Sequence, residues 1–232
     1  MSISTLMAMP AAAGLFRQAV TQSGAASHLL GESVARRVTR TLAESLGVEP
    51  TVDGFASVDL DKFVTEQARF TAAVAVDRNP ATWGELVLNS MPFEPTIDGE
   101  VVPGPPLELI RSGAGSGVRV LTGTNRDEMT LFLAPTGLVE RGDEADLEIM
   151  AGFYGLSVDA VNVYRRERPE AVPGELIIDV VTDWVFRIPA IRVAEARVEA
   201  AAEAGVTLEM GAEPTYVYEF GWRTLVGRAA WG

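Results

Sequence analysis

The protein is a chain of 232 residues in which 32 Asp and Glu residues outnumber 19 Lys and Arg residues, for a formal net charge of −13. An acidic chain repels nucleic-acid phosphates and anionic lipid surfaces, because binding to either depends on a basic surface. The absence of Cys excludes disulfides, thiolate metal ligands and a cysteine nucleophile. We therefore expect no nucleic-acid or membrane partner. The single histidine means that any Ser-His-acid hydrolase written entirely in this chain would have to use His28.

The composition is that of a globular protein, with 47% hydrophobic and 22% charged residues. The first nine residues lack the basic start of a signal peptide, and no apolar run approaches the 18 residues or more of a membrane span. The expected compartment is the cytoplasm.

The first half of the chain predicts one strand and several helices. The expected elements are a helix fragment over residues 1–15, a strand over 17–22, and helices over 33–46 and 59–75. In the helix predicted over 33–46, Val34, Val38 and Leu42 fall four residues apart, and Gly47 stands where a left-handed C-cap is expected.

The second half alternates again between strands and helices. A proline-rich stretch over 80–117 predicts a long, partly extended loop. After it we expect a strand over 118–123, helices over 147–153, 158–166, 176–186 and 191–204, and a strand over 215–220. Pro189 is expected to separate the last two helices.

This order of elements is typical of an α/β protein with a parallel sheet. Sheets of that kind usually have about five or six strands, and about three with several helices are predicted here. Residues 1–232 are therefore expected to form one incomplete α/β domain.

The most informative segment is Gly123-Thr124-Asn125-Arg126-Asp127-Glu128, directly after the second strand. Ligands of open α/β sheets bind beyond the carboxyl ends of the strands, so an acid in this place is a candidate for chemistry. The structural alternative is a capping box, because Asn125 precedes Glu128 by three residues and the acid would then satisfy backbone donors at a helix start. The pattern leaves both interpretations open.

Five segments together resemble the type-B carboxylesterases, an α/β-hydrolase family that includes cholinesterases and para-nitrobenzyl esterases. In chain order they are Gly14–Gly24, Ile97–Pro103, Gly123–Glu128, Asp183–Ala190 and Tyr216–Phe220. The resemblance covers nearly the whole chain. It implies a partial α/β-hydrolase fold and a small carboxylic ester as the substrate of the complete enzyme.

The resemblance also implies roles for single residues. Glu128 matches the acid of a Ser-Glu-His triad, with Asp127 as the second choice; such an acid orients the histidine and stabilises its charged form. Ser23 matches a serine near the acid and would donate a supporting hydrogen bond to it, or would simply close a strand into a turn. Leu131 and Phe132 match positions that line the substrate pocket, or they belong to the core.

The chain departs from the family at the other two triad members. The nucleophile motif Gly-x-Ser-x-Gly is absent; the nearest string, Gly31–Ala35, lacks the second glycine and a convincing preceding strand, and Ser33 suits a helix N-cap better. His28 precedes the acid, contrary to the family's order, and is expected to be a surface or loop residue. The resemblance places the nucleophile before Met1 and the histidine after Gly232.

The leading hypothesis is a segment of a serine ester hydrolase that carries only the triad acid, is inactive alone and needs no cofactor or metal. One alternative is a non-catalytic, esterase-like interaction module. Another is an α/β piece with no independent role, which would be prone to aggregation because a sheet edge would be uncovered. The ester preferred and the oligomeric state stay open.

Overall fold

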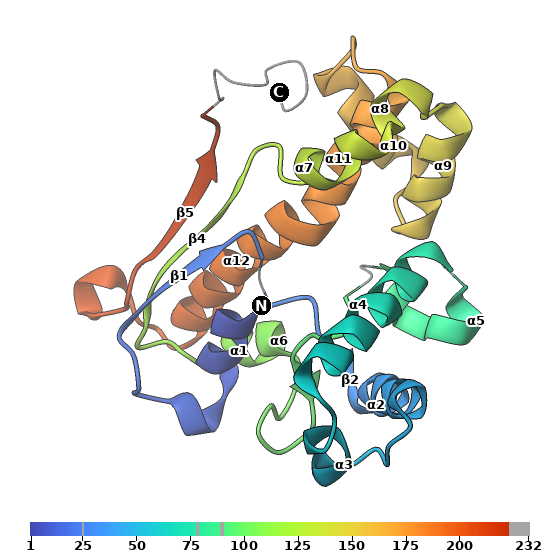
Figure 1. Cartoon of the computed structure of the whole chain (residues 1–232). Coiled ribbons are helices and arrows are strands. Elements are labelled where there is room, and N and C mark those ends of the chain that lie inside the picture. Colours follow the sequence, from blue (N-terminus) through green and yellow to red (C-terminus); the bar gives the residue numbers. More distant parts are fainter. Residues whose placement is uncertain (25, 78, 89–90, 223–232) are drawn as a thin grey trace. The chain divides into compact units, whose positions relative to one another are not determined.

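A computed structural model describes residues 1–24, 26–77, 79–88 and 91–222 (Figure 1). The chain divides into two compact units, one formed by Met1–Ser27 with Pro105–Gly232 and the other by His28–Gly104. Each unit has its own hydrophobic clusters.

The first unit contains a parallel sheet in the order β1-β4-β5. Its strands are β1 (Gln18–Gln22), β4 (Arg119–Asn125) and β5 (Thr215–Phe220). Gln22 of β1 is in register with Gly123 of β4, which in turn is in register with Tyr218 of β5. The three strands predicted for this region are confirmed, and their carboxyl ends meet at one edge.

The helices of the first unit include the one predicted at the start of the chain and those predicted over 147–204, together with helices between residues 106 and 141 that are not among the predicted elements. They are α1 (Ser2–Ala8), α6 (Pro106–Arg111), α7 (Thr130–Leu133), α8 (Leu138–Arg141), α9 (Glu144–Phe153), α10 (Val158–Glu167), α11 (Pro173–Thr182) and α12 (Ile188–Glu203). Short 3-10 turns lie at Pro10–Ala12, Ala134–Thr136 and Leu208–Met210.

The sheet is covered on one face. Val120 of β4 is fully buried in a cluster with Val193 and Ala196 of α12, which runs beside the sheet (Figure 1). On the opposite face Val20, Leu121 and Tyr216 form one row across the three strands and are 45%, 37% and 56% exposed. Parallel sheets normally bury both faces, so this row is an unusually apolar surface.

A second cluster joins α9, α10 and α11 through Leu147, Val161, Leu176 and Ile177. The turn Asp183–Arg187 that follows α11 is a π-helix, and it leads directly into α12 with helical backbone angles at both junctions. The prediction that Pro189 separates two helices is therefore wrong. A wide π turn before the proline avoids the clash and the lost hydrogen bond that would otherwise end the helix.

The second unit is mainly helical. It contains α2 (Glu32–Leu46), α3 (Val52–Ala56), α4 (Leu60–Val76), α5 (Pro80–Trp83) and a 3-10 turn at Gly84–Leu88. Two short strands, β2 (Leu30–Gly31) and β3 (Thr96–Ile97), pair in parallel. Leu30, Val34, Val38, Phe70 and Val74 form its core.

One of the two caps predicted for α2 is confirmed and the other is wrong. Gly47 caps α2 in the left-handed conformation with φ of 73°, as expected. Ser33 is not the N-cap, because α2 begins at Glu32 and Gly31 takes that position. The predicted proline-rich loop is also only partly correct, since it contains α5, β3 and α6; α6 has a proline in its first turn, where the missing N–H is harmless.

None of the described helices combines the length and the apolar character needed to cross a lipid bilayer.

Candidate site at the carboxyl edge of the sheet

Glu128 lies in the turn that follows β4 and is 8% exposed. Its Oε1 accepts a hydrogen bond of 2.7 Å from the backbone N–H of Asn125, and its Oε2 accepts one of 3.0 Å from Nδ2 of the same residue. A carboxylate offers about four acceptor positions, so both oxygens retain the capacity to bind a further donor.

The capping-box interpretation is only half correct. Glu128 does satisfy the backbone N–H of Asn125, as that interpretation expected. However, α7 begins at Thr130, and Met129 rather than Asn125 is its N-cap. Within the described part of the chain the reciprocal bond, from the Glu128 N–H to the Asn125 side chain, is not formed. The two residues therefore stabilise a turn that follows the strand, not a helix start.

The Glu128 loop, residues 126–129, is held from two sides. The N–H of Arg126 donates to Phe220 O of β5 (3.0 Å), and its guanidinium donates to Gly221 O (3.3 Å). On the other side the N–H of Met129 donates to the buried Thr182 hydroxyl of α11 (3.1 Å). Arg187 of the π turn donates to Arg126 O (2.5 Å). Sequence reasoning identified Asn125 but missed Thr182 and Arg187, because their bonds to the loop span 53 and 61 residues.

Ser23 lies at the same edge, directly after β1. Its N–H donates to Gly123 O (3.0 Å), which places it beside the end of β4. Its φ of 53° is in the left-handed region, an unusual conformation for a residue other than glycine. Among the described residues no hydrogen bond joins Ser23 to Glu128, so the structure brings the two to one edge without linking them.

Leu131 and Phe132 follow the Glu128 loop in α7. Their side chains are 60% and 58% exposed. The alternative that they belong to the hydrophobic core is therefore wrong.

Ser33 and His28 belong to the second unit. Ser33 is exposed in the first turn of α2, and, contrary to expectation, a two-residue strand, β2, precedes it. His28 lies outside helices and strands, as expected, but it is 5% exposed and not a surface residue.

A charged cavity of about 760 Å³ adjoins the Glu128 loop. Its polar lining consists of Arg126, Asp127, Tyr164, Glu167, Arg168, Asp179, Asp183, Arg187 and Glu219. Burial raises the pKa of Tyr164, and the hydrogen bond of 2.7 Å that its hydroxyl donates to Asp183 adds to this effect. Burial also raises the pKa of Asp179, against the opposing effect of its ion pair with Arg168.

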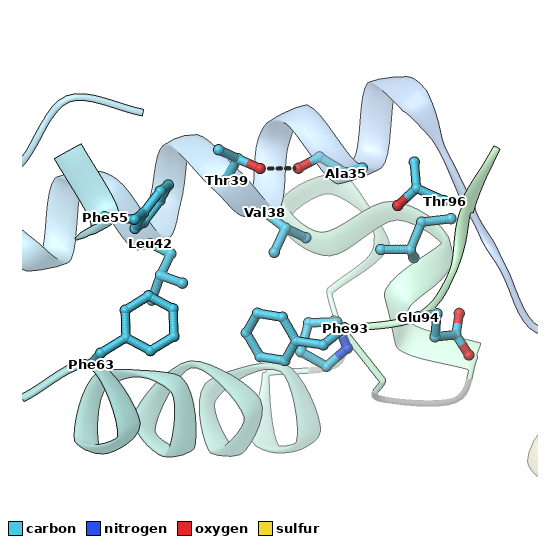
Figure 2. Close-up of a pocket in the computed structure, with 11 residues that line it drawn as sticks. Ala35, Val38, Thr39, Leu42, Phe55, Phe63, Phe93, Glu94 and Thr96 are labelled. Carbon is cyan, nitrogen blue, oxygen red and sulfur yellow. Dashed lines mark hydrogen bonds between the residues drawn. The ribbon is translucent and has the colours of Figure 1, made fainter. Parts of the chain in front are cut away.

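The second unit contains a different cavity, of about 350 Å³. Figure 2 shows it between α2 and α4, with Phe55, Phe63 and Phe93 along its length and Glu94 toward one end. Its lining is mainly apolar, and none of the residues predicted to act in catalysis contributes to it.

In the described residues no group of three or more His, Asp or Glu side chains has the arrangement of a metal site.

Comparison with known proteins shows that the sequence is similar to carboxylesterases over nearly its whole length. A model of the Carboxylesterase family matches residues 1–226. The para-nitrobenzyl esterase of Bacillus subtilis (strain 168) is 31% identical over 224 residues, which are 96% of this chain and 40% of that protein. Carboxylesterase 1E of Mus musculus is 25% identical over 237 residues, covering 94% of this chain and 40% of the relative.

Solved structures show the same relationship. The carboxylesterase EST55 of Geobacillus stearothermophilus superposes with a TM-score of 0.71 at 26% identity, over 99% of this chain and 43% of that one. A PNB esterase superposes with a TM-score of 0.64 at 26% identity, over 97% of this chain and 42% of that one. The predicted partial α/β-hydrolase fold is confirmed. The chain spans about two fifths of the length of each of these proteins.

Proposed function

The chain belongs to the carboxylesterase family, and from this premise we propose that it is the part of a serine ester hydrolase that carries the acid of a Ser-Glu-His triad, Glu128. The observation that carries the proposal is the place of Glu128: a largely buried carboxylate, at the carboxyl edge of a parallel sheet, in a loop anchored to both β5 and α11.

In this role the carboxylate of Glu128 accepts the imidazole N–H of a histidine. That bond selects the tautomer whose other nitrogen removes the serine proton, and it stabilises the imidazolium formed as the serine attacks the ester carbonyl. The bonds from Asn125 hold the carboxylate in one orientation while leaving acceptor capacity for the imidazole. The substrate is a small carboxylic ester, and no metal or cofactor takes part.

The other proposed roles lie close by. Ser23 is proposed as a hydrogen-bond donor to the acid, because its N–H bond to Gly123 O places it at the same edge of the sheet. Leu131 and Phe132 present two adjacent apolar side chains just beyond the Glu128 loop, and this suits the wall of a pocket for the apolar part of an ester.

Neither Ser33 nor His28 is suited to complete the triad within these 232 residues. Ser33 is an exposed residue inside a helix turn and lacks the second glycine of the nucleophile motif. We therefore include in the proposal that the isolated chain hydrolyses esters at no more than a trace rate, because triad members act as a unit. Hydrolysis of a short-chain aryl ester by the purified chain tests this. Robust turnover that Ser33→Ala abolishes would overturn it.

A chimera tests the role of Glu128 directly. In it, this chain replaces the matched residues of the Bacillus subtilis para-nitrobenzyl esterase, and the rest of that protein stays unchanged. Glu128→Gln should lower kcat by roughly 10³- to 10⁴-fold, as expected for an acid replaced by its amide. Asp127→Asn is the matched control and should retain most activity. Loss of activity in Asp127→Asn alone would transfer the role to Asp127.

One observation favours a second candidate, a non-catalytic interaction module. The row formed by Val20, Leu121 and Tyr216 leaves an apolar sheet face exposed, and such faces are used in protein interfaces. The DNA that flanks the reading frame discriminates between the two: a Gly-x-Ser-x-Gly motif encoded upstream and a histidine downstream would support the enzyme, and their absence would support the module.

A further inference from the structure

We infer that Arg187 is a positioning residue: one guanidinium fixes the Glu128 loop against the end of β5. This inference rests on the proposed role of Glu128. It identifies a residue that contacts neither the acid nor a substrate but determines where the acid lies.

The contacts of Arg187 converge from three elements. Its Nη2 donates to Arg126 O in the Glu128 loop (2.5 Å). Its Nη1 donates to Asp183 at the other end of the π turn and forms an ion pair with it. Its Nε lies 3.3 Å from Glu219 Oε2 on β5, a charge contact without the geometry of a hydrogen bond. Two directed hydrogen bonds and one charge contact of a single guanidinium thus join the π turn, the loop and the strand.

The π turn makes this arrangement possible. π-helical turns are rare, and when they interrupt α-helices they frequently mark functional sites. Here the turn covers Asp183–Arg187, so the two residues of the ion pair, Asp183 and Arg187, occupy its two ends. Asp183 is itself held by the Tyr164 hydroxyl at 2.7 Å, which keeps the carboxylate directed at the guanidinium.

We call the contacts of Arg187 with Asp183, Arg126 and Glu219 the clamp. The position of Arg126 O explains why the clamp matters for Glu128. Arg126 is two residues from Glu128, and its N–H is bonded to Phe220 O. Glu219 is in register with Thr124 near the end of β4. Arg187 therefore closes a ring that runs from β4 through the Glu128 loop to β5. Displacement of a reacting group by about 1 Å can cost roughly 10²-fold in rate, so such a ring has a function in a triad.

The geometry of these contacts suits an arginine better than a lysine. Its planar fork presents donors in fixed directions, whereas a lysine ammonium is a single point charge on a flexible stem. Arg187→Lys should keep an attraction to Asp183 or Glu219, and so most of the stability, but it cannot reach all three partners at once.

Amide hydrogen exchange on the 232-residue chain tests the clamp without reference to catalysis. In Arg187→Lys and Arg187→Met, the amides of Asn125, Arg126 and Met129 should exchange about tenfold faster, because the loop opens locally. Amides of α9, which lies in the same unit as Arg187, are the internal reference and should not change. Arg111→Met is the matched control, since Arg111 also bridges two carboxylates, but these belong to Glu108 of α6 and Glu199 of α12 and not to the Glu128 loop.

Two results would overturn the clamp. One is unchanged exchange at residues 125–129 in both variants; the other is equal acceleration in the loop and in α9, which would mean that Arg187 only supports the stability of the whole unit. Arg187→Lys keeps the test decisive if Arg187→Met does not fold.

The chimera separates the clamp from the proposed function. There Arg187→Lys should lower kcat at least tenfold with KM within about twofold, because the acid acts on the transition state and not on substrate binding. Faster loop exchange with unchanged kcat would overturn positioning while leaving the Glu128 role intact. Full activity of Glu128→Gln would instead overturn the proposed function, whatever the exchange rates show.

Discussion

Asn125 and Glu128 are joined twice, by the backbone N–H and by the side-chain amide of Asn125, each of which donates to a different oxygen of the same carboxylate. Removal of the carboxylate takes away the acceptor of both donors in two partly buried hydrogen bonds. We expect Glu128→Ala to lower the free energy of unfolding by about 1–3 kcal/mol and Glu128→Gln, which keeps one acceptor oxygen, by less.

Urea unfolding of the chain measures this difference. Asp127→Ala is the control in the same loop, because Asp127 forms only a partly exposed ion pair of 3.5 Å with Arg126 and should contribute no more than about 0.5 kcal/mol. An equal effect of Glu128→Ala and Asp127→Ala would contradict the prediction.

Arg197 joins α12 to the sheet from inside the first unit. Its guanidinium donates to the Thr215 hydroxyl (2.7 Å), Gly115 O (2.8 Å) and Val118 O (2.5 Å), and burial lowers its pKa. Arg197→Met should cost about 2–4 kcal/mol of unfolding free energy, because it leaves one buried and two partly buried acceptors without this donor. Thermal and urea unfolding provide the measurement.

Arg197→Lys should recover only part of that loss, since one ammonium cannot reproduce three directed bonds. Arg192→Met, at an exposed position of the same helix, is the control and should change stability by less than about 0.5 kcal/mol. The prediction is wrong if the two methionine variants unfold alike.

Gly123 allows β4 and β5 to approach. A Cβ at this position would lie 2.2 Å from Tyr218 O, a backbone atom that cannot move without disturbing the strand pair. Gly123→Ala should destabilise the chain by about 1–3 kcal/mol or more. Gly117→Ala is the comparison, since a Cβ at Gly117 meets nothing within 4 Å. Near-identical melting curves for the two variants would refute the argument.

Asp98 organises the turn after β3. Its Oδ1 accepts the N–H groups of Val102 (2.8 Å) and Glu100 (3.0 Å), and these bonds, the one from Val102 first, lower the pKa of the carboxyl below 3.8. A lowered pKa in the folded state means that the contribution to stability is present above the ordinary pKa and is lost as the pH falls through the lowered value.

An NMR titration measures this effect at the hydrogen bond that the Val102 N–H donates to Asp98. The amide shift of Val102 should titrate with a midpoint below 3.8 and should lose this step in Asp98→Asn. A midpoint at or above 3.8 would contradict the assignment.

Most of the regular elements are predictable from nearby residues. The strand over 215–220 has the predicted bounds, and α2 and α4 begin and end within one residue of prediction, because β-branched runs, four-residue spacing and Gly47 are local signals. The continuity across Pro189 could not be predicted in this way. It depends on a π turn, and a pattern of proline and apolar residues predicts a helix end there instead.

The candidate site also has one part that the sequence determines and one part that only the tertiary structure determines. Residue chemistry and spacing alone establish an acid after β4, its neighbour Asn125, and the absence of thiol chemistry, since these depend on what stands next to what along the chain. The position of Glu128, in contrast, depends on tertiary structure. Arg187 and Thr182 bind the Glu128 loop from 61 and 53 residues away along the chain. Such contacts form only when packing of the helices against the sheet brings distant segments together, and a directed bond between them leaves no periodic trace in the sequence.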